Sequence, residues 1–289
     1  MRVLIAGAGG QIGRALVATA PRGLSIVALA RDQLDVSREA SVHRAVKAEA
    51  PDLLINATGY TAVDRAEAEP EQAWAVNERG AGHLAEAAAA VGGRMVHFST
   101  DYVFDGSQRR PYTPADPPNP LNVYGATKLA GERAVLAALG DRAAIIRTAW
   151  VYAAEGRNFL LTMLRLMKER DEVRVVSDQT GTPTSAVSAA SAAWAVAARA
   201  DVQGVLHWTD AGVASWFDFA VAIAEEAGKL GILSRAIPIR PIATEEFPTP
   251  ARRPRYSVLD CTETLAVTGL TPDHWRIALR RTLEELPRD

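Results

Sequence analysis

The stretch Gly7-Ala8-Gly9-Gly10-Gln11-Ile12-Gly13 decides the fold of this chain. It joins an apolar run at 3–6, which has the length of a buried strand, to a helical pattern over 12–20. Glycines at such a turn let the backbone bend tightly, and the N–H groups at the helix N-terminus then attract an anion. The spacing is Gly7-x-x-Gly10-x-x-Gly13, because Ile12 stands where the G-x-G-x-x-G pattern has its last glycine. We expect the turn to bind the pyrophosphate of a dinucleotide; the alternative is a tight turn without a ligand.

Short apolar runs alternate with helical patterns outward from this turn. Strands are expected at 3–6, 25–29, 53–56, 95–99, 143–147, 173–176 and 205–207, and helices over 12–20, 41–50, 72–91, 124–139, 187–199 and 216–228. Apolar strands separated by helices predict a parallel sheet covered on both faces. The expected fold class is therefore α/β, with a Rossmann-like doubly wound parallel sheet and a smaller, irregular C-terminal lobe.

The regular alternation stops after Trp208, and a Pro-rich passage follows over 238–254. We expect an NAD(P)-binding Rossmann domain over 1–149 plus about 173–208. The substrate domain is expected over about 150–172 and 209–289.

Composition excludes several classes of protein. Of the 289 residues, 48% are hydrophobic and 23% are charged, which is ordinary for a globular protein and argues against disorder. The 32 basic and 34 acidic residues leave a net charge of −2, so we expect neither a nucleic-acid nor a membrane partner. The single cysteine, Cys261, forms no internal disulfide, and no targeting or membrane-spanning segment stands out. We therefore expect a cytoplasmic protein.

The second expected strand ends at Arg31 and Asp32. An acidic residue at this place usually binds the adenosine ribose, whereas an arginine can hold a 2′-phosphate. Because Arg31 comes first, we expect NADPH to be preferred and NADH to be tolerated. The alternative is that Arg31 is a solvated loop charge.

Tyr124 and Lys128 begin a helical pattern and, being four residues apart, share one face of it. A phenol has a pKa of about 10, and a neighbouring ammonium lowers this pKa. The pair therefore suits general acid–base catalysis of a carbonyl–alcohol interconversion. Thr100 follows the strand at 95–99, at the sheet edge where ligands bind, and its hydroxyl can bind the same carbonyl oxygen. The alternatives are a tyrosine packed on a lysine stem and a hydroxyl that caps a strand.

With these motifs in order, the chain resembles the extended short-chain dehydrogenase/reductase superfamily, and within it the dTDP-4-dehydrorhamnose reductase family. The resemblance spans nearly the whole chain, and its most specific blocks are 99–106, 176–184 and 252–260. It implies that NAD(P)H gives a hydride to C4 of dTDP-4-dehydro-β-L-rhamnose, which yields dTDP-L-rhamnose. It also implies that Tyr124 protonates the alkoxide, that Lys128 holds the nicotinamide ribose and lowers the tyrosine pKa, and that Thr100 orients the carbonyl.

The resemblance implies further site residues. The implied cofactor contacts are Gly7, Gly10, Gln11, Ile12, Gly13, Arg31, Asp35, Val36, Ala57, Thr58, Tyr60, Tyr124 and Lys128. The implied contacts to the nucleotide sugar are Thr100, Asp101, Tyr102, Trp150, Asn158 and Arg253. We favour Arg253 over Arg252 as the diphosphate contact, since the planar guanidinium fork suits phosphate oxygens. The alternative for Trp150 is core packing, and for Asn158 it is capping of the following helix. Asn77 is expected to support a proton relay at a helix irregularity, or else to bond locally.

One departure from the family bears on assembly. Some relatives form dimers through Mg²⁺ held by glutamates, one of them two residues after the last glycine, where this chain has Ala15. The five histidines also lack the spacing of metal ligands. We therefore expect no metal, and a monomer or a homodimer without a bridging metal.

Other functions on the same architecture stay open. One is a 4-ketoreductase or an epimerase acting on another nucleotide 6-deoxyhexose. The other is a non-catalytic regulatory subunit, because a fold does not determine a function. Such subunits alter the Thr-Asp pair after the fourth strand, so the intact Thr100 and Asp101 favour catalysis.

Overall fold

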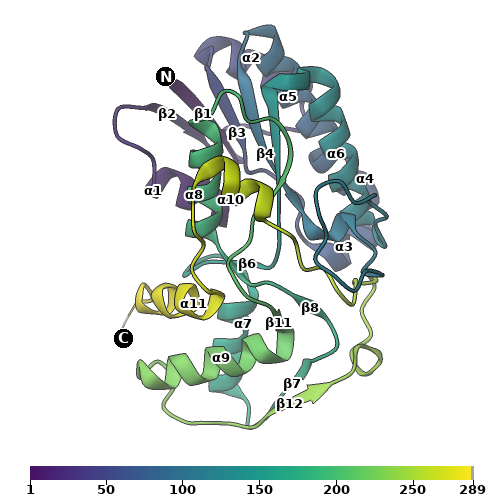
Figure 1. Ribbon diagram of the computed structural model, residues 1–289, viewed down its shortest axis with the longest axis vertical. Helices are drawn as coiled ribbons and strands as arrows, with labels where there is room; N and C mark the ends of the chain where they lie inside the picture. Colours follow the sequence, from purple (N-terminus) through teal and green to yellow (C-terminus); the bar gives the residue numbers. More distant parts are fainter. Residues whose placement is uncertain (288–289) are drawn as a thin grey trace.

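The computed structural model describes residues 1–287, and within them a six-stranded parallel sheet forms the larger body of the molecule (Figure 1). The strand order is β10–β5–β4–β3–β1–β2. The strands are β1 (Arg2–Ala6), β2 (Ser25–Leu29), β3 (Leu53–Asn56), β4 (Arg94–Thr100), β5 (Ala143–Thr148) and β10 (Gly204–His207). This architecture confirms the predicted fold class.

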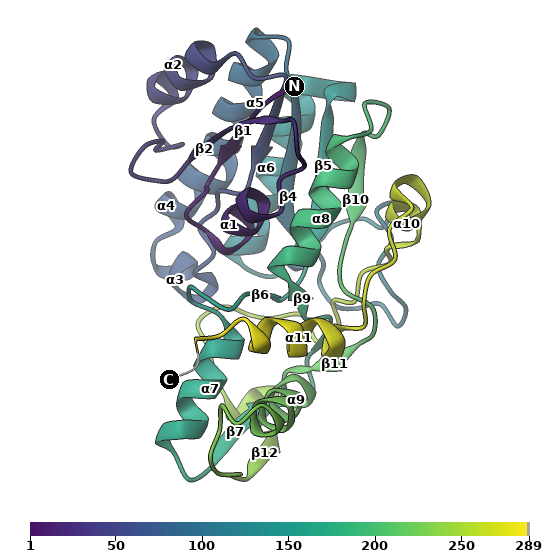
Figure 2. The same cartoon turned by 90° about the vertical axis from the view of Figure 1, so that its left-hand side faces the viewer.

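Alternate side chains of each strand enter two separate cores. In β1, Val3 and Ile5 join the core beneath α1 (Gln11–Ala18) and α8 (Ala186–Ala197). Leu4 and Ala6 join the core beneath α2 (Glu39–Glu49), α5 (Gly80–Ala90) and α6 (Val123–Leu139). Figures 1 and 2 show these helices on the two faces of the sheet. Burial on both faces explains why the strands are apolar without alternation.

The glycine turn lies where the strand order reverses, between β1 and β3. Gly7 has a φ of +86°, and a β-carbon there would lie 2.7 Å from the backbone of Ala57. A β-carbon on Gly13 would lie 2.1 Å from the carbonyl oxygen of Gly7. Only glycine fits either position, because the turn is pressed between β3 and the start of α1.

The long helix expected over 72–91 is interrupted. It consists of α4 (Pro70–Trp74), a wide π-helical turn η1 (Ala75–Arg79) and α5. Asn77 lies in the wide turn, where its side chain bonds the backbone of Tyr60 and the hydroxyl of Thr127. The expected helix irregularity at Asn77 is confirmed.

A second lobe packs below the sheet around Tyr152, Phe219 and Trp275. Its helices are α7 (Phe159–Glu169), α9 (Trp216–Lys229) and α11 (Trp275–Glu284), and its two-stranded parallel sheet joins β7 (Val173–Val176) to β12 (Ile239–Ile242). The sequence analysis placed 173–176 in the Rossmann domain, and this placement is wrong. Val173 and Val175 enter the core of the lower lobe, because an apolar run does not show which sheet it joins.

The chain passes between body and lobe several times. The remaining elements are α3 (Val63–Ala68), η2 (Asp101–Val103), η3 (Gly140–Arg142), β6 (Val151–Tyr152), β8 (Thr180–Gly181), β9 (Thr184–Ser185), β11 (Ala214–Ser215), η4 (Thr244–Glu246) and α10 (Thr262–Thr268). Leu265 and Val267 of α10 pack against the core of the sheet body, although the sequence analysis grouped 209–289 with the lobe. Within residues 1–287, none of the helices has the length and apolar character needed to cross a membrane.

Candidate active site

A cavity of about 720 Å³ lies at the carboxyl ends of β1, β2 and β3. Its lining consists of Gly7, Gly9, Gly10, Ala30, Arg31, Asp32, Leu34, Asp35, Val36, Ala57, Thr58, Gly59, Tyr60 and Val76. Open α/β sheets bind ligands at such a reversal of strand order. The cavity therefore brings together most of the residues that the sequence analysis assigned to a dinucleotide.

The glycine turn fits a pyrophosphate. Gly10 is the N-cap of α1, so the first N–H groups of that helix are not covered by a capping side chain. The turn has no room for a β-carbon at Gly7 or Gly13, which keeps its backbone close to the cavity. Together these features form a cradle for an anion.

Five of the expected cofactor residues lie outside this lining, namely Gln11, Ile12, Gly13, Tyr124 and Lys128. The Gln11 side chain accepts a hydrogen bond from Asn158 Nδ2 at 2.7 Å and so faces the lower lobe. Ile12 packs against the core beneath α1, and Gly13 lies beneath the turn. Of the residues predicted in the glycine motif, Gly7 and Gly10 line the cavity, whereas Gln11, Ile12 and Gly13 make contacts outside it.

Polar contacts hold the segment after β3. The backbone N–H and the hydroxyl of Thr58 both donate to Asn56 Oδ1, at 2.9 and 2.6 Å. The N–H of Tyr60 donates to Asn77 Oδ1 at 2.8 Å, and its phenol donates to Glu69 Oε2 at 2.7 Å. The wide turn at Asn77 thus fixes one wall of the cavity.

Thr100 and Tyr124 meet at the end of β4. The Thr100 hydroxyl donates to Asp101 Oδ1 at 3.1 Å and accepts from the N–H of Tyr102 at 3.2 Å. The rings of Tyr102 and Tyr124 meet edge to face, with centroids 5.8 Å apart. Burial raises the pKa of Tyr124 to about 12, although a hydrogen bond with Thr100 opposes this shift. The structure therefore assembles the hydroxyl and the phenol that the sequence analysis paired.

Lys128 lies one turn further along α6 and is buried. Its Nζ donates to the carbonyl oxygen of Phe98 at 2.5 Å. Burial lowers the pKa of Lys128 to about 8, and the charge of Glu132 opposes this shift. Burial is the largest influence on the pKa of Tyr124, and the expectation that Lys128 lowers this pKa stays a prediction.

A buried ion pair lies behind Lys128. Arg147 donates to both carboxylate oxygens of Glu132, at 2.9 and 2.7 Å, and the Ser99 hydroxyl donates to the same carboxylate. Glu132 was not among the residues predicted for the site. Its position could have been inferred from the sequence, because Lys128 and Glu132 are four residues apart and share one face of α6.

Asp101 and Tyr102 follow Thr100 in the turn η2. Asp101 is 2% exposed, and burial raises its pKa to about 7. Burial also raises the pKa of the Tyr102 phenol. Both residues adjoin the Thr100–Tyr124 pair, which is where the resemblance placed a sugar.

Two expected substrate residues make structural contacts. Trp150 has a φ of +46° and stacks on Trp216, with ring centroids 3.5 Å apart. Asn158 caps α7, since its Oδ1 accepts from the N–H of Leu161 at 2.9 Å. The capping alternative for Asn158 is thus confirmed. Trp150 is partly buried against Trp216, and a role of either residue toward substrate stays a prediction.

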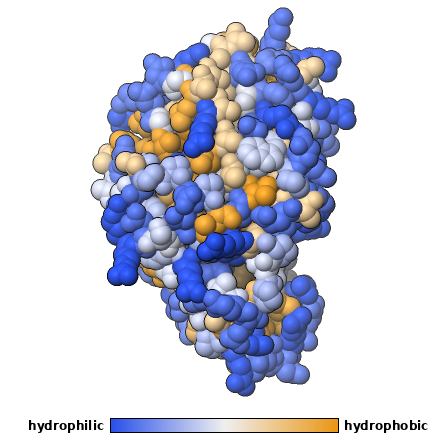
Figure 3. All heavy atoms as spheres, turned by 90° about the vertical axis from the view of Figure 1, so that its right-hand side faces the viewer, coloured by the Kyte–Doolittle hydropathy of each residue, from blue (hydrophilic) through white to orange (hydrophobic). Residues whose placement is uncertain are grey.

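A second cavity, of about 450 Å³, lies between the sheet body and the lower lobe. It is lined by Asp105, Gly106, Ser107, Leu121, Gln179, Thr244, Glu245, Phe247, Pro248, Thr249, Pro250, Ala251, Arg252, Arg253 and Arg255. Figure 3 shows a hollow between body and lobe, on a face where hydrophilic side chains predominate. Its charged side chains are Arg252, Arg253 and Arg255 together with Asp105 and Glu245, and the guanidinium groups suit an anion.

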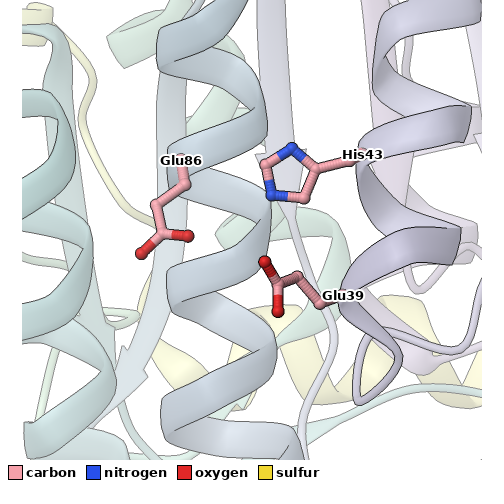
Figure 4. Close-up of side chains that lie close together, drawn as sticks. All are labelled: Glu39, His43 and Glu86. Atoms are coloured by element: carbon pink, nitrogen blue, oxygen red, sulfur yellow. The ribbon is translucent and has the colours of Figure 1, made fainter.

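Three side chains that suit a metal ion come together elsewhere. Glu39 and His43 of α2 and Glu86 of α5 place their ligand atoms within 4.8 Å of one another (Figure 4). The sequence analysis missed this group, because the third residue comes from a different helix. The three residues lie outside the linings of the two cavities described above. The expectation that the protein binds no metal stays a prediction.

The sequence of residues 1–288 matches the protein family described as "RmlD substrate binding domain". The chain belongs to this family. A curated relative from Burkholderia thailandensis, named dTDP-4-dehydrorhamnose reductase, is 44% identical over 296 residues, covering 99% of this chain and 99% of the relative. The predicted family resemblance is confirmed.

Solved structures of proteins with the same name share the fold. The dTDP-4-dehydrorhamnose reductase of Clostridium acetobutylicum is 39% identical with a TM-score of 0.92, covering 98% of this chain and 99% of that one. The enzyme of Bacillus anthracis, solved in complex with NADP, is 35% identical with a TM-score of 0.92, again covering 98% and 99%. Body and lobe are therefore common to this chain and to those proteins.

Proposed function

We propose that this protein is a dTDP-4-dehydrorhamnose reductase, an NADPH-dependent oxidoreductase of dTDP-rhamnose biosynthesis. It reduces the C4 ketone of dTDP-4-dehydro-β-L-rhamnose and yields dTDP-L-rhamnose. The observation that carries the proposal is the meeting of Thr100 and Tyr124 at the carboxyl end of β4, with Lys128 buried one turn further along α6. The same sheet carries the cavity at the glycine turn. Full-length relatives that bear this name support it.

The dinucleotide would lie on the glycine turn and along the wall formed by Arg31, Thr58 and Tyr60. When bound, NADPH supplies the hydride. The chain itself supplies positioning and a proton. The Thr100 hydroxyl holds the ketone oxygen, and the Tyr124 phenol donates its proton to that oxygen as the alkoxide develops.

The pKa values fit this division of roles. With a pKa of about 12, Tyr124 is protonated at neutral pH and is ready to act as an acid. Lys128 carries its charge below a pKa of about 8, so its ammonium can bind ribose hydroxyls and stabilise the phenolate left after proton transfer. Asn77 joins the cavity wall to Thr127 on the catalytic helix, and we assign it the support of the proton relay.

The finer features are proposals of the same kind. Arg31 lies at the cavity and would favour the 2′-phosphate of NADPH, with NADH accepted more weakly. Asp101, Tyr102 and Arg253 would contact the substrate, with Trp150 and Asn158 in support. We also propose a cytoplasmic monomer or homodimer without a bridging metal, whose Rossmann domain excludes 173–176.

The decisive experiment follows NADPH oxidation with substrate generated in place by a 3,5-epimerase from dTDP-4-dehydro-6-deoxy-glucose. Epimerase-dependent turnover that falls by roughly a hundredfold or more in Tyr124→Phe supports both the reaction and the acid. Absence of turnover with intact cofactor binding would point to another nucleotide sugar or to a regulatory subunit. An epimerase would instead retain its cofactor through purification and turn over without net oxidation.

A further inference from the structure

The segment that carries Arg253 is docked on the sheet body at two points. The N–H of Ala251 donates to Asp64 Oδ1 at 3.3 Å, and Asn122 Nδ2 donates to the carbonyl oxygen of Arg252 at 2.7 Å. Asp64 lies in the first turn of α3, and Asn122 is the N-cap of α6, the helix that carries Tyr124. The segment is therefore held against the catalytic helix.

Asp64 forms a bidentate ion pair with the Arg253 guanidinium. Nη1 and Nη2 donate to its two carboxylate oxygens, at 3.0 and 2.8 Å. Nη1 also donates to Thr249 Oγ1 at 2.5 Å and to the carbonyl oxygen of Ala251 at 3.1 Å. The Arg253 side chain is 19% exposed and the Asp64 side chain is 41% exposed, so the guanidinium is largely shielded from water while the carboxylate is partly solvated.

These contacts leave one edge of the guanidinium without a carboxylate partner. The Nε–H and the outer Nη2–H lie on the same edge and form a fork that matches two phosphate oxygens. Among residues 1–287, Asp64 is the carboxylate that pairs with Arg253, and the Tyr102 phenol lies beside the same guanidinium. Arg253 also lines the cavity of about 450 Å³. A guanidinium that is anchored on one edge and meets no carboxylate on the other is prepared to bind an anion there.

We propose that Asp64 is a positioning residue that fixes Arg253 so that the other edge of the guanidinium binds the diphosphate of the nucleotide sugar. This inference rests on the proposed function, which supplies a substrate with a diphosphate. An arginine that is already held loses less conformational freedom on binding than a mobile one, and the affinity rises accordingly. The pairing also neutralises Asp64, whose free carboxylate would repel the diphosphate.

The test compares Asp64→Asn with the matched variant Asp171→Asn. Asp171 pairs with Arg235 at 2.7 Å on the exposed surface of the lower lobe, so both variants remove one charge and one arginine partner. The readouts are dTDP binding by calorimetry to the NADP-saturated protein, and steady-state kinetics. In Asp64→Asn we expect the dTDP dissociation constant and the substrate KM to rise roughly tenfold, with kcat and NADPH affinity nearly unchanged. Asp171→Asn should behave as wild type.

A double variant separates positioning from a structural role. Arg253→Lys loses the fork, and adding Asp64→Asn to it should weaken dTDP binding no further, because Asp64 acts through Arg253. Additive effects, or a loss of NADPH affinity and thermal stability that matches the loss of dTDP affinity, would overturn the proposal. So would an Asp64→Asn variant that binds dTDP as tightly as wild type while the wild type reduces the substrate. If the wild type binds dTDP in an Asp64-dependent way without reducing the substrate, the proposed function fails and the positioning role holds.

Discussion

Gly125 lies against the carbonyl oxygen of Tyr102, so closely that a β-carbon at position 125 would come within 2.1 Å of that oxygen. The contact joins the first turn of α6 to the turn η2 that follows β4. Tyr124 precedes Gly125, so the contact brings its phenol beside Thr100. The distance between the proton donor and the carbonyl-binding hydroxyl is therefore set by a backbone approach that only glycine allows.

Gly125→Ala should reduce activity more than its size suggests. The new methyl group must push α6 away from η2, and a displacement of about 1 Å in an active site costs roughly a hundredfold in rate. We expect kcat to fall by at least about tenfold, with a lower melting temperature. Gly82→Ala, in helix α5, is the matched control. Its β-carbon would lie 3.6 Å from the Ala134 side chain of α6, which is an ordinary van der Waals distance. If Gly125→Ala retains full kcat, α6 is not positioned by this contact.

The activity should fall as the pH rises through about 8. Burial lowers the pKa of Lys128 to about 8, so the ammonium that holds the ribose loses its proton above that pH. The measurement is kcat/KM from about pH 6 to about pH 10, for wild type and Lys128→Arg. Arginine keeps its charge over this range, so the alkaline decline should shift to higher pH in the variant. An unchanged decline would assign it to another group.

The contribution of Asp101 to the stability of the protein should fall as the pH rises from about 4 to about 7. Burial raises the pKa of Asp101 from 3.8 to about 7, so in this range the folded protein retains a proton that the unfolded chain has lost. The stability that the neutral carboxyl contributes is fully present below pH 3.8, the pKa of Asp101 in the unfolded chain. It is lost as the pH rises to about 7, the pKa of Asp101 in the folded protein. Such a shift corresponds to a few kcal/mol at most.

Denaturation at several pH values tests this behaviour. Asp101→Asn has no titrating group at this position, so its free energy of unfolding should depend less on pH between about 4 and 7. Asp171→Asn, which alters an exposed carboxylate, should follow the wild-type curve. Parallel curves for wild type and Asp101→Asn would show that Asp101 is ionised in the folded protein.

The sequence predicts local structure here better than it predicts contacts between distant segments. The strands at 25–29 and 53–56 have the expected bounds, because a buried parallel strand is a continuous apolar run bounded by turn residues. The same signal predicted 173–176 in the large sheet, whereas this strand pairs with β12 in the lower lobe. An apolar run does not show which strand it pairs with.

Contacts between distant segments explain the other differences. The Asp64–Arg253 pair joins residues that are 189 positions apart, so no spacing rule reveals it. The sequence paired Tyr124 with Lys128 correctly as neighbours on a helix, but their pKa values depend on burial by β4 and η2. Desolvation is a property of the assembled fold, and the residue pattern does not show it.

Removing Glu132 should destabilise the protein strongly. Its carboxylate is the buried partner of Arg147, and breaking such a pair leaves an uncompensated charge at a cost of about 3–5 kcal/mol. Chemical denaturation of Glu132→Gln measures this loss. The double variant Glu132→Leu with Arg147→Met should recover much of it, because no unpaired charge then remains. A Glu132→Gln variant as stable as wild type would show that the pair contributes little.

Arg31 should determine the preference for NADPH over NADH. It lies with Asp32 at the end of β2 on the rim of the larger cavity, where the 2′ position of the adenosine ribose would be bound. Loss of one charge-assisted phosphate contact costs about 1.5–3 kcal/mol, so Arg31→Ala should raise the KM for NADPH roughly tenfold or more and leave the KM for NADH nearly unchanged. Asp32→Asn serves as the comparison and should improve NADPH binding slightly, because it removes a negative charge near the phosphate. Equal KM values for the two cofactors in the wild type would mean that Arg31 is a solvated loop residue. In that case the 2′-phosphate makes no productive contact with this rim.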